Sequence, residues 1–237
     1  SIVRKSKDII SRWSAAPELN GALEFGRFMT KHGILASIAH TDAIYEDVIQ
    51  AFENGFTHMT HLYSAMSGVT RRHAFRYAGV IESAFLIDEM TVEIIADGVH
   101  LPPSLLQLIY KTKGASRIAL VTDSMRAAGM PEGPSILGSL KEGQSVIVED
   151  GVAKLHDRTA FAGSVATADR LVRNMVNLAG VNLLEAVQMI TSTPAKICGI
   201  FSEKGSIAVG KQADLVIFDQ DITINQTIIN GRVIYSK

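Results

Sequence analysis

The sequence has 237 residues, of which 47% are hydrophobic, and its formal net charge is −1. This length and apolar content are enough for one domain with a sizeable core and a small appendage, or for two domains. The near-zero charge gives no electrostatic basis for binding nucleic acid or an anionic membrane surface. Because Cys198 is the only cysteine, a disulfide framework and a cysteine-ligated metal centre are excluded, and a reducing compartment, the cytoplasm, is expected.

The first half of the chain alternates strand and helix signals. Strands are expected at residues 8–15, 34–40, 57–62, 91–97 and 117–123. Helices are expected between them at residues 19–32, 43–53 and 102–112, with Thr41 as the N-cap of the second. The segment 63–79 is expected to be a long irregular loop. Strands that alternate with helices predict right-handed βαβ units and a parallel sheet of the barrel type.

The alternation stops after residue 123. A β-hairpin is expected near 144–156, where Glu149-Asp150-Gly151 separates two β-prone runs. Helices are then expected at 166–179 and 183–198, with Pro194 starting a separate short helix. Residues 205–237 contain only strand and turn signals, including an Asn-Gly turn, so they predict a small β-appendage. The fold class is therefore α/β.

Polar residues follow the expected strands at the points where they end. His40, His61, His100 and Asp123 occupy such positions, and in an α/β barrel the carboxyl ends of the strands meet at one mouth. Histidine is the commonest ligand of divalent metals, so the first two predict half of a metal site that activates water. Asp123 could transfer the proton, and His100 could polarise a carbonyl group.

Each of these residues also has a simpler interpretation. A single histidine more often makes a structural hydrogen bond than binds a metal, and Asp123 could be a helix cap or a loop residue. Four such residues at the same end of consecutive strands favour a site. The adjacent Arg71 and Arg72 could be solvated or could bind a phosphate.

Five short segments form a specific combination: 39–41 (Ala-His-Thr), 60–66 (Thr-His-Leu-Tyr-Ser-Ala-Met), 95–100 (Ile-Ala-Asp-Gly-Val-His), 120–123 (Leu-Val-Thr-Asp) and 161–164 (Phe-Ala-Gly-Ser). Together they resemble the N-acetylglucosamine-6-phosphate deacetylases of the amidohydrolase superfamily. The segment 205–218 is similar to the stretch that returns from the barrel to the β-sandwich in that superfamily. The resemblance implies a partial TIM-type (β/α)8 barrel in residues 1–204, with about five of eight strands, and a small β-sandwich segment in residues 205–237.

The resemblance also implies a role for each matching residue. His40 and His61 correspond to histidine ligands of a catalytic divalent metal, zinc or iron, and Asp123 to the general base and acid. The substrate-binding positions are Ser64, Ala65, Arg72, His100, Phe161, Ala162 and Gly163. The implied reaction is hydrolysis of the N-acetyl group of N-acetylglucosamine 6-phosphate to glucosamine 6-phosphate and acetate. Arg72 corresponds to an arginine that binds phosphate in the neighbouring subunit's site, which implies a homodimer.

The chain departs from the family pattern in two ways. Ser64 stands where the family has asparagine, and the acidic metal ligand belongs to strands that precede the five expected here. Together with the start at Ser1, this predicts a carboxyl-terminal portion with an open barrel and little activity alone. Two alternatives remain: another metal amidohydrolase, such as a cyclic-amide hydrolase or deaminase, and a non-catalytic half-barrel. The sequence contains no apolar run of about 18 residues and no basic-then-apolar leader, so no membrane span or secretory signal is expected.

Overall fold

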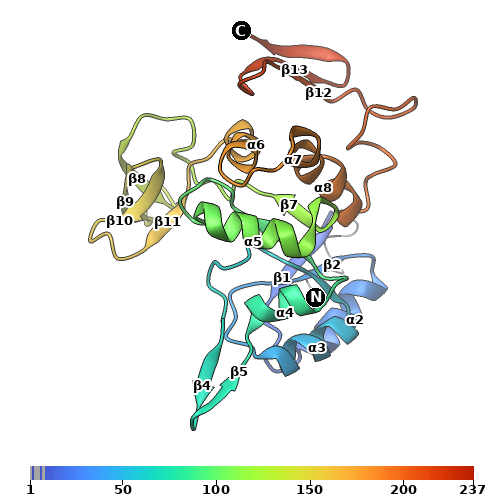
Figure 1. Cartoon of the computed structure of the whole chain (residues 1–237), viewed down its shortest axis with the longest axis vertical. Coiled ribbons are helices and arrows are strands. Elements are labelled where there is room, and N and C mark those ends of the chain that lie inside the picture. Colours follow the sequence, from blue (N-terminus) through green and yellow to red (C-terminus); the bar gives the residue numbers. More distant parts are fainter. Residues whose placement is uncertain (1, 3–5, 7–8) are drawn as a thin grey trace.

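The computed structural model describes residues 2, 6 and 9–237. Its centre is a parallel sheet of five strands in the order β1-β2-β3-β6-β7 (Figure 1). These strands are β1 (Arg12–Ala15), β2 (Leu35–Ile38), β3 (Phe56–Met59), β6 (Thr91–Ile94) and β7 (Ile118–Leu120). The predicted parallel sheet is therefore confirmed, with strands shorter than expected. The first was expected to begin at Asp8, which lies outside the described residues.

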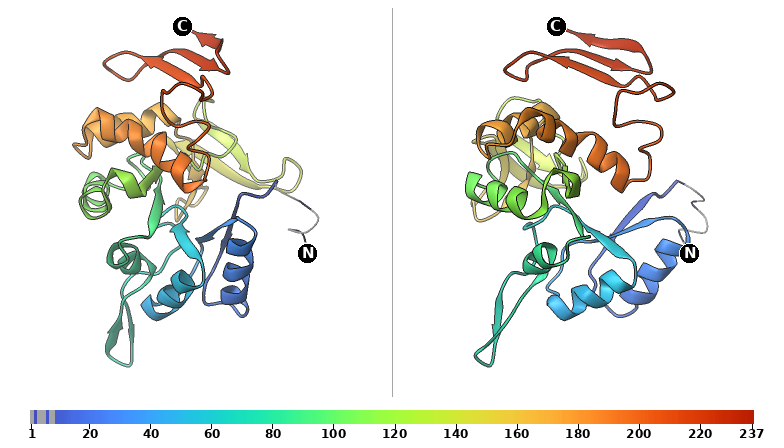
Figure 2. Two further views of the ribbon diagram at one scale, coloured as in Figure 1. Left: turned by 90° about the vertical axis from the view of Figure 1, so that its right-hand side faces the viewer. Right: turned by 45° about the vertical axis from the view of Figure 1, so that its right-hand side comes forward.

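Helices connect these strands and pack on one face of the sheet (Figure 2). They are α2 (Ala22–Lys31), α3 (Tyr45–Glu53), α4 (Val80–Leu86) and α5 (Pro103–Lys113), followed by the 3-10 turn η1 (Ala115–Arg117). Under them lies the main core, which contains the strand residues Ile38, Met59 and Ile94, each fully buried. A parallel sheet needs such crossover helices to cover its apolar face.

The opposite face of the sheet is polar. Parallel register places Ser14 beside Ser37, Ser37 beside His58 and His58 beside Thr91, and side chains of a strand alternate between the two faces. Glu93 therefore shares this face, where its carboxylate lies 3.2 Å from His58 Nε2 and also contacts the Arg12 guanidinium. The strand pattern of alternating polar and apolar residues thus produces a sheet with one helix-covered face and one polar face.

Two local expectations were wrong. Helix α3 begins at Tyr45 and not at Ala43, and Asp47 Oδ2 accepts a hydrogen bond from the Ile44 backbone nitrogen at 3.0 Å. Thr41 is therefore not its N-cap; it forms an isolated bridge with Met66. The segment 63–79 is not irregular throughout, because it contains a projecting hairpin of β4 (Thr70–Arg72) and β5 (Phe75–Tyr77) (Figure 1).

The hairpin expected near 144–156 is present within a larger insert. This insert is an antiparallel sheet in the order β11-β10-β9-β8. Its strands are β8 (Gly133–Leu137), β9 (Gln144–Glu149), β10 (Val152–Leu155) and β11 (Phe161–Ser164). It has a small core of its own, in which Val146 and Ala153 are fully buried. We refer to these four strands as the insert sheet.

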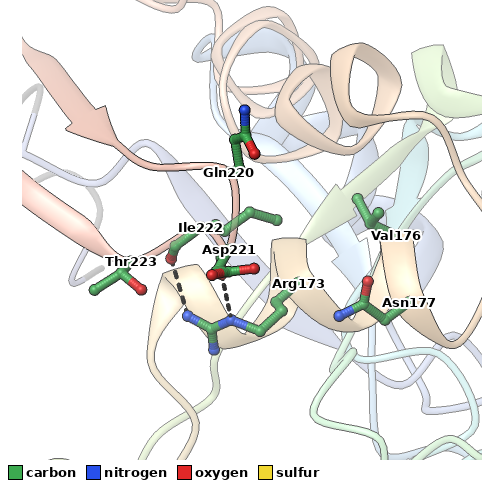
Figure 3. Close-up of a pocket in the computed structure, with 7 residues that line it drawn as sticks. All are labelled: Arg173, Val176, Asn177, Gln220, Asp221, Ile222 and Thr223. Atoms are coloured by element: carbon green, nitrogen blue, oxygen red, sulfur yellow. Dashed lines mark hydrogen bonds between the residues drawn. The ribbon is translucent and has the colours of Figure 1, made fainter.

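Three helices and a last sheet complete the chain. The helices are α6 (Ala168–Asn177), α7 (Leu183–Ile190) and α8 (Ser192–Ile197), and the strands are β12 (Leu215–Phe218), β13 (Ile224–Ile229) and β14 (Arg232–Ser236). Arg173 of α6 attaches this sheet, because its guanidinium donates to the carbonyl oxygens of Asp221 and Ile222 at 3.1 and 2.9 Å (Figure 3). Among the described residues, the helices are all too short or too polar to cross a membrane.

Candidate active site at the carboxyl end of the sheet

His40 and His61 face each other at the carboxyl end of the parallel sheet. Their Nε2 atoms are 3.0 Å apart and their ring planes are inclined by 79°. Each lies two residues beyond the last paired residue of its strand, since Ile38 pairs with Met59 in the register of β2 and β3. The register of the sheet therefore brings the two imidazoles together.

The backbone at this end of the sheet adopts unusual conformations. His40, His61 and Asp123 have φ angles of 50°, 33° and 45°. Positive φ is uncommon for residues other than glycine and is concentrated at functional sites, where surrounding contacts hold it. At His40 such a contact is the hydrogen bond from the Thr41 nitrogen to the Ala65 oxygen at 3.0 Å. The loop after His61 thus supports the turn at His40.

The environment of His61 favours a neutral imidazole. The residue is 7% exposed, and its Nδ1 has no hydrogen-bond partner among the described residues. Burial lowers the pKa of His61, and the negative charge of Asp123 opposes that change in part. A neutral imidazole is the form that binds a metal ion.

The histidine pair matches half of a metal-ligand set. Two nitrogens bound at 2.0–2.1 Å to a tetrahedral ion lie about 3.3 Å apart, close to the 3.0 Å between the two Nε2 atoms. Within residues 2, 6 and 9–237 there is no cluster of three or more histidine, cysteine, aspartate or glutamate side chains that could hold an ion. The two donors present fit a divalent metal.

The insert sheet runs beside Asp123. The Ser164 nitrogen donates to the Asp123 oxygen at 3.4 Å, and the Met125 nitrogen donates to the Ser164 oxygen at 2.9 Å. Strand β11 is thereby aligned with the segment that follows β7, and it brings Phe161, Ala162 and Gly163 to the carboxyl end of the sheet. The side chain of Asp123 is exposed there.

His100 is held by a buried carboxylate. Its Nδ1 is 2.7 Å from Asp97 Oδ2, and Asp97 Oδ1 accepts from the Val99 and His100 backbone nitrogens at 2.9 and 2.8 Å. Burial would raise the pKa of Asp97, but the hydrogen bonds from His100 and from the two backbone groups lower it overall. The other side of the imidazole contacts Phe161, with ring centroids 4.8 Å apart.

The structure brings most of the predicted site residues together, but not all of them. Ser64 and Ala65 follow His61 directly, and the Ser64 nitrogen donates to the His61 oxygen at 2.9 Å. Arg72 is separate: it is exposed on the β4–β5 hairpin, where its guanidinium carbon lies 5.4 Å from the Tyr77 ring centroid. Within the described part of the chain, no hydrogen bond or ion pair joins Arg72 to the other predicted residues.

Two residues of this region carried no predicted role. Asp97 stands three positions before His100, a spacing that places both in one turn after β6. Glu18 follows β1, accepts a hydrogen bond from the Asp42 nitrogen at 2.9 Å and contacts the Thr41 hydroxyl. In the sequence, the signal for Glu18 was its position after a strand end. Its hydrogen-bond partners, Asp42 and Thr41, can be identified only from the structure.

Known proteins match nearly the whole of this chain. The model of the Amidohydrolase family matches residues 11–234. N-acetylglucosamine-6-phosphate deacetylase of Bacillus subtilis (strain 168) is 38% identical over 220 residues, which are 93% of this chain and 53% of the relative. The crystal structure of N-acetylglucosamine-6-phosphate deacetylase from Pasteurella multocida matches with a TM-score of 0.87 at 31% identity, over 97% of this chain and 57% of that chain.

A structure with a bound sugar phosphate also matches. It is a mutant N-acetyl-D-glucosamine-6-phosphate deacetylase from Mycobacterium smegmatis in complex with N-acetyl-D-glucosamine-6-phosphate, with a TM-score of 0.85 at 32% identity over 94% of this chain and 57% of that chain. This chain thus spans little more than half the length of the relatives it matches. The family fold is of the TIM-barrel type, and its members are generally metal-dependent. The match covers nearly all of the sequence, and the chain belongs to the amidohydrolase family.

Proposed function

We propose that this chain forms part of a metal-dependent deacetylase that hydrolyses N-acetylglucosamine 6-phosphate to glucosamine 6-phosphate and acetate. The observation that carries the proposal is the pair of Nε2 atoms 3.0 Å apart on His40 and His61, in a chain 38% identical to such a deacetylase. The alternative of a different amidohydrolase is less well supported, because the similar proteins reported above share one named activity.

In this proposal His40 and His61 hold a divalent metal ion, zinc or iron. The ion, when bound, acts as a Lewis acid and lowers the pKa of a water molecule at the site toward about 7. Burial keeps the pKa of His61 low, so this ligand stays unprotonated at neutral pH. The donor atoms are imidazole nitrogens, which suit both metals.

Asp123 transfers the proton, and His100 polarises the carbonyl group of the substrate. The Asp123 carboxylate takes a proton from water as the water oxygen bonds to the acetyl carbon, and it returns that proton to the sugar nitrogen as the carbon–nitrogen bond breaks. His100 donates a hydrogen bond from Nε2 to the carbonyl oxygen, which becomes negatively charged during attack. Its Nδ1 lies 2.7 Å from Asp97 Oδ2, and this contact fixes the orientation of the ring.

We further propose that the five-stranded sheet is completed to an eight-stranded barrel by a polypeptide outside this sequence. Three features support this. β1 and β7 are edge strands in the described residues, the other face of the sheet is polar and would line the interior, and the matched relatives are almost twice as long. That polypeptide would supply the third protein ligand and the rest of the small β domain that begins here with residues 205–237.

Substrate contacts are assigned to the remaining residues. Ser64, Ala65, Phe161, Ala162 and Gly163 lie in the loop after His61 and in β11, at the same end of the sheet. Arg72 is exposed on a hairpin that projects from the body (Figure 1). We propose that it reaches the site of a second copy and binds the phosphate there, which makes the active unit a homodimer.

The experiment that tests the function measures bound metal and released acetate. The chain is assayed with N-acetylglucosamine 6-phosphate, alone and with the amino-terminal part of the Bacillus subtilis relative supplied as a separate polypeptide. We expect little acetate release alone and release in the mixture. Release by the chain alone, with stoichiometric metal, would contradict the need for a third ligand. If neither preparation releases acetate while the chain binds metal, the deacetylase function is wrong.

A further inference from the structure

Helix α6 binds the backbone of the loop that carries His100. Arg170 Nη2 donates to the Asp97 oxygen at 2.7 Å, and Asn174 Nδ2 donates to the Ala96 oxygen at 3.0 Å. These two residues are four positions apart and therefore lie on one face of the helix. The loop between β6 and α5 is thus held from the side by two adjacent hydrogen bonds.

Arg170 also binds the insert sheet. Its Nη1 donates to the Gly151 oxygen at 2.9 Å, and Gly151 is in the turn between β9 and β10. One guanidinium therefore joins two separate elements. The first carries Asp97, which bonds His100, and the second is the sheet whose strand β11 carries Phe161. The two rings meet with centroids 4.8 Å apart.

Gly151 accommodates this arginine because it has no side chain. A Cβ atom at that position would lie 3.0 and 3.1 Å from the two terminal nitrogens of Arg170, and the residue has a φ of +69°. Both the close approach and the left-handed backbone favour glycine. The planar fork of arginine can donate in two directions at once, whereas a lysine ammonium is a point charge on a flexible stem.

We propose that Arg170 is a positioning residue that fixes the insert sheet to the β6–α5 loop and thereby holds the Phe161 ring against the His100 imidazole. The proposal deepens the proposed function, because it rests on His100 and Phe161 as substrate-binding residues. The insert sheet has its own small core, and in the described residues the Ser124–Ser164 bridge and the contact between Phe161 and His100 also join it to the rest of the chain. Arg170 adds a point of attachment at the turn between β9 and β10, which further restricts the orientation of the sheet.

The test compares Arg170→Lys and Arg170→Met with Arg173→Met in the full chain. Arg173 is the matched control, because it lies on the same helix and also donates to two backbone carbonyls, those of Asp221 and Ile222. Amide hydrogen exchange is measured over residues 150–165, and the NMR signal of the His100 imidazole is recorded. Phe161→Leu calibrates the NMR signal, since it removes the neighbouring aromatic ring directly.

We expect both Arg170 variants to exchange at least about tenfold faster over residues 150–165, as the loss of one hydrogen bond to a charged group would give. The His100 signal should shift toward its position in Phe161→Leu, and Arg173→Met should leave both readouts unchanged. Equal exchange in the wild type and the Arg170 variants, or the same change in Arg173→Met, would overturn the proposal.

If Arg170→Met does not fold, Arg170→Gln provides a second variant, because it keeps a polar side chain and removes the guanidinium that donates to both carbonyls. The same local increase in exchange is expected, and its absence would also count against the proposal. Both readouts work without turnover. A chain that releases no acetate would therefore count against the proposed deacetylase and leave the result for Arg170 unaffected.

Discussion

The Nε2 atoms of His40 and His61 lie 3.0 Å apart because the two residues occupy equivalent positions on neighbouring strands. Ile38 pairs with Met59 in the parallel register, and each histidine follows its strand by two residues. Both histidines have a left-handed φ, so the chain turns at the same distance beyond the end of each strand. Two strands, each followed by a similar turn, are enough to bring two imidazole nitrogens together.

Replacing either histidine should abolish most metal binding. We expect His40→Ala and His61→Ala to weaken zinc affinity by at least about 100-fold, more than the 10–100-fold that outer-shell partners contribute. Isothermal titration of the metal-free chain with zinc measures this. His32→Ala is the control, because His32 is exposed at the end of α2 and its ring nitrogen lies 2.7 Å from the Phe28 oxygen. Unchanged affinity in the His40 variant would show that the metal is not bound there.

Stability should fall at mildly acidic pH because of His58. Burial and then the charge of Arg12 lower the pKa of His58 from 6.5 to about 3. Between those two pH values the unfolded state binds more protons at His58 than the folded state does. His58 therefore contributes most to the free energy of unfolding above pH 6.5, and this contribution decreases as the pH falls toward 3. At pH 4.5 the loss is about 3 kcal/mol, at about 1.4 kcal/mol per pKa unit.

Urea unfolding at pH 7.5 and 4.5 checks this expectation. His58→Gln cannot take up a proton, so its free energy of unfolding should fall less between the two pH values than that of the wild type. The comparison uses the pH-dependent difference, because the substitution also removes contacts with Thr91 and Glu93. His73→Gln, on the exposed hairpin, should behave like the wild type. Equal pH dependence of wild type and His58→Gln would mean that another group is responsible.

Much of the parallel sheet could be predicted from the sequence, for a physical reason. Strand and helix periods alternate along 8–123, and parallel strands require such crossovers. The missed elements lacked that signal. β8 contains Gly133 and Pro134, β11 has four residues including Gly163, and α4 has seven residues. Strand β4 has the sequence Thr-Arg-Arg, and β5 places Arg76 between two aromatic residues, a composition that resembles a solvated loop.

The parts of the site that depend on tertiary contacts could not be read from the sequence. The strand-end histidines were predictable because the carboxyl ends of parallel strands share one edge. By contrast, the contact of His100 with Phe161 joins residues 61 positions apart through the insert sheet. Threonine is a typical N-cap residue, but Thr41 does not cap a helix. It forms a bridge with Met66 at the turn after His40.

Asp123→Asn should remove acetate release and leave metal binding intact. The amide cannot accept the proton from water, so kcat should fall by about 10²–10⁴-fold, the usual contribution of general acid–base catalysis. The assay uses the preparation that releases acetate, and zinc affinity is measured in parallel. Asp88→Asn, which precedes β6 at the opposite end of the sheet, should have normal kcat. A normal kcat in Asp123→Asn would assign the proton transfer to another residue.

Arg72→Ala distinguishes a sugar-phosphate deacetylase from another amidohydrolase. If Arg72 binds phosphate, its loss should raise KM for N-acetylglucosamine 6-phosphate by about tenfold and leave kcat unchanged, because the contact is made equally in the ground and transition states. A neutral N-acetyl sugar should be unaffected. Arg76→Ala is the control, since Arg76 is an exposed arginine on the partner strand of the same hairpin. An increase in KM for both substrates would argue against a phosphate contact.

Glu18 provides the last test, because it separates a supporting carboxylate from a missing metal ligand. It accepts a hydrogen bond from the Asp42 nitrogen and contacts the Thr41 hydroxyl, so it holds the turn that follows His40. Glu18→Gln keeps an oxygen acceptor and should retain zinc affinity within about threefold. Glu18→Ala loses both contacts and should weaken affinity by about 10–100-fold, as the loss of an outer-shell partner does.

The opposite ranking would change the assignment. A carboxylate that binds the ion directly cannot be replaced by an amide without loss of charge, so Glu18→Gln would then weaken zinc binding as strongly as His40→Ala. That result would make Glu18 the acidic ligand and would remove the need for one from another polypeptide. Retained affinity in Glu18→Gln, combined with reduced affinity in Glu18→Ala, leaves Glu18 as the residue that orients the His40 turn.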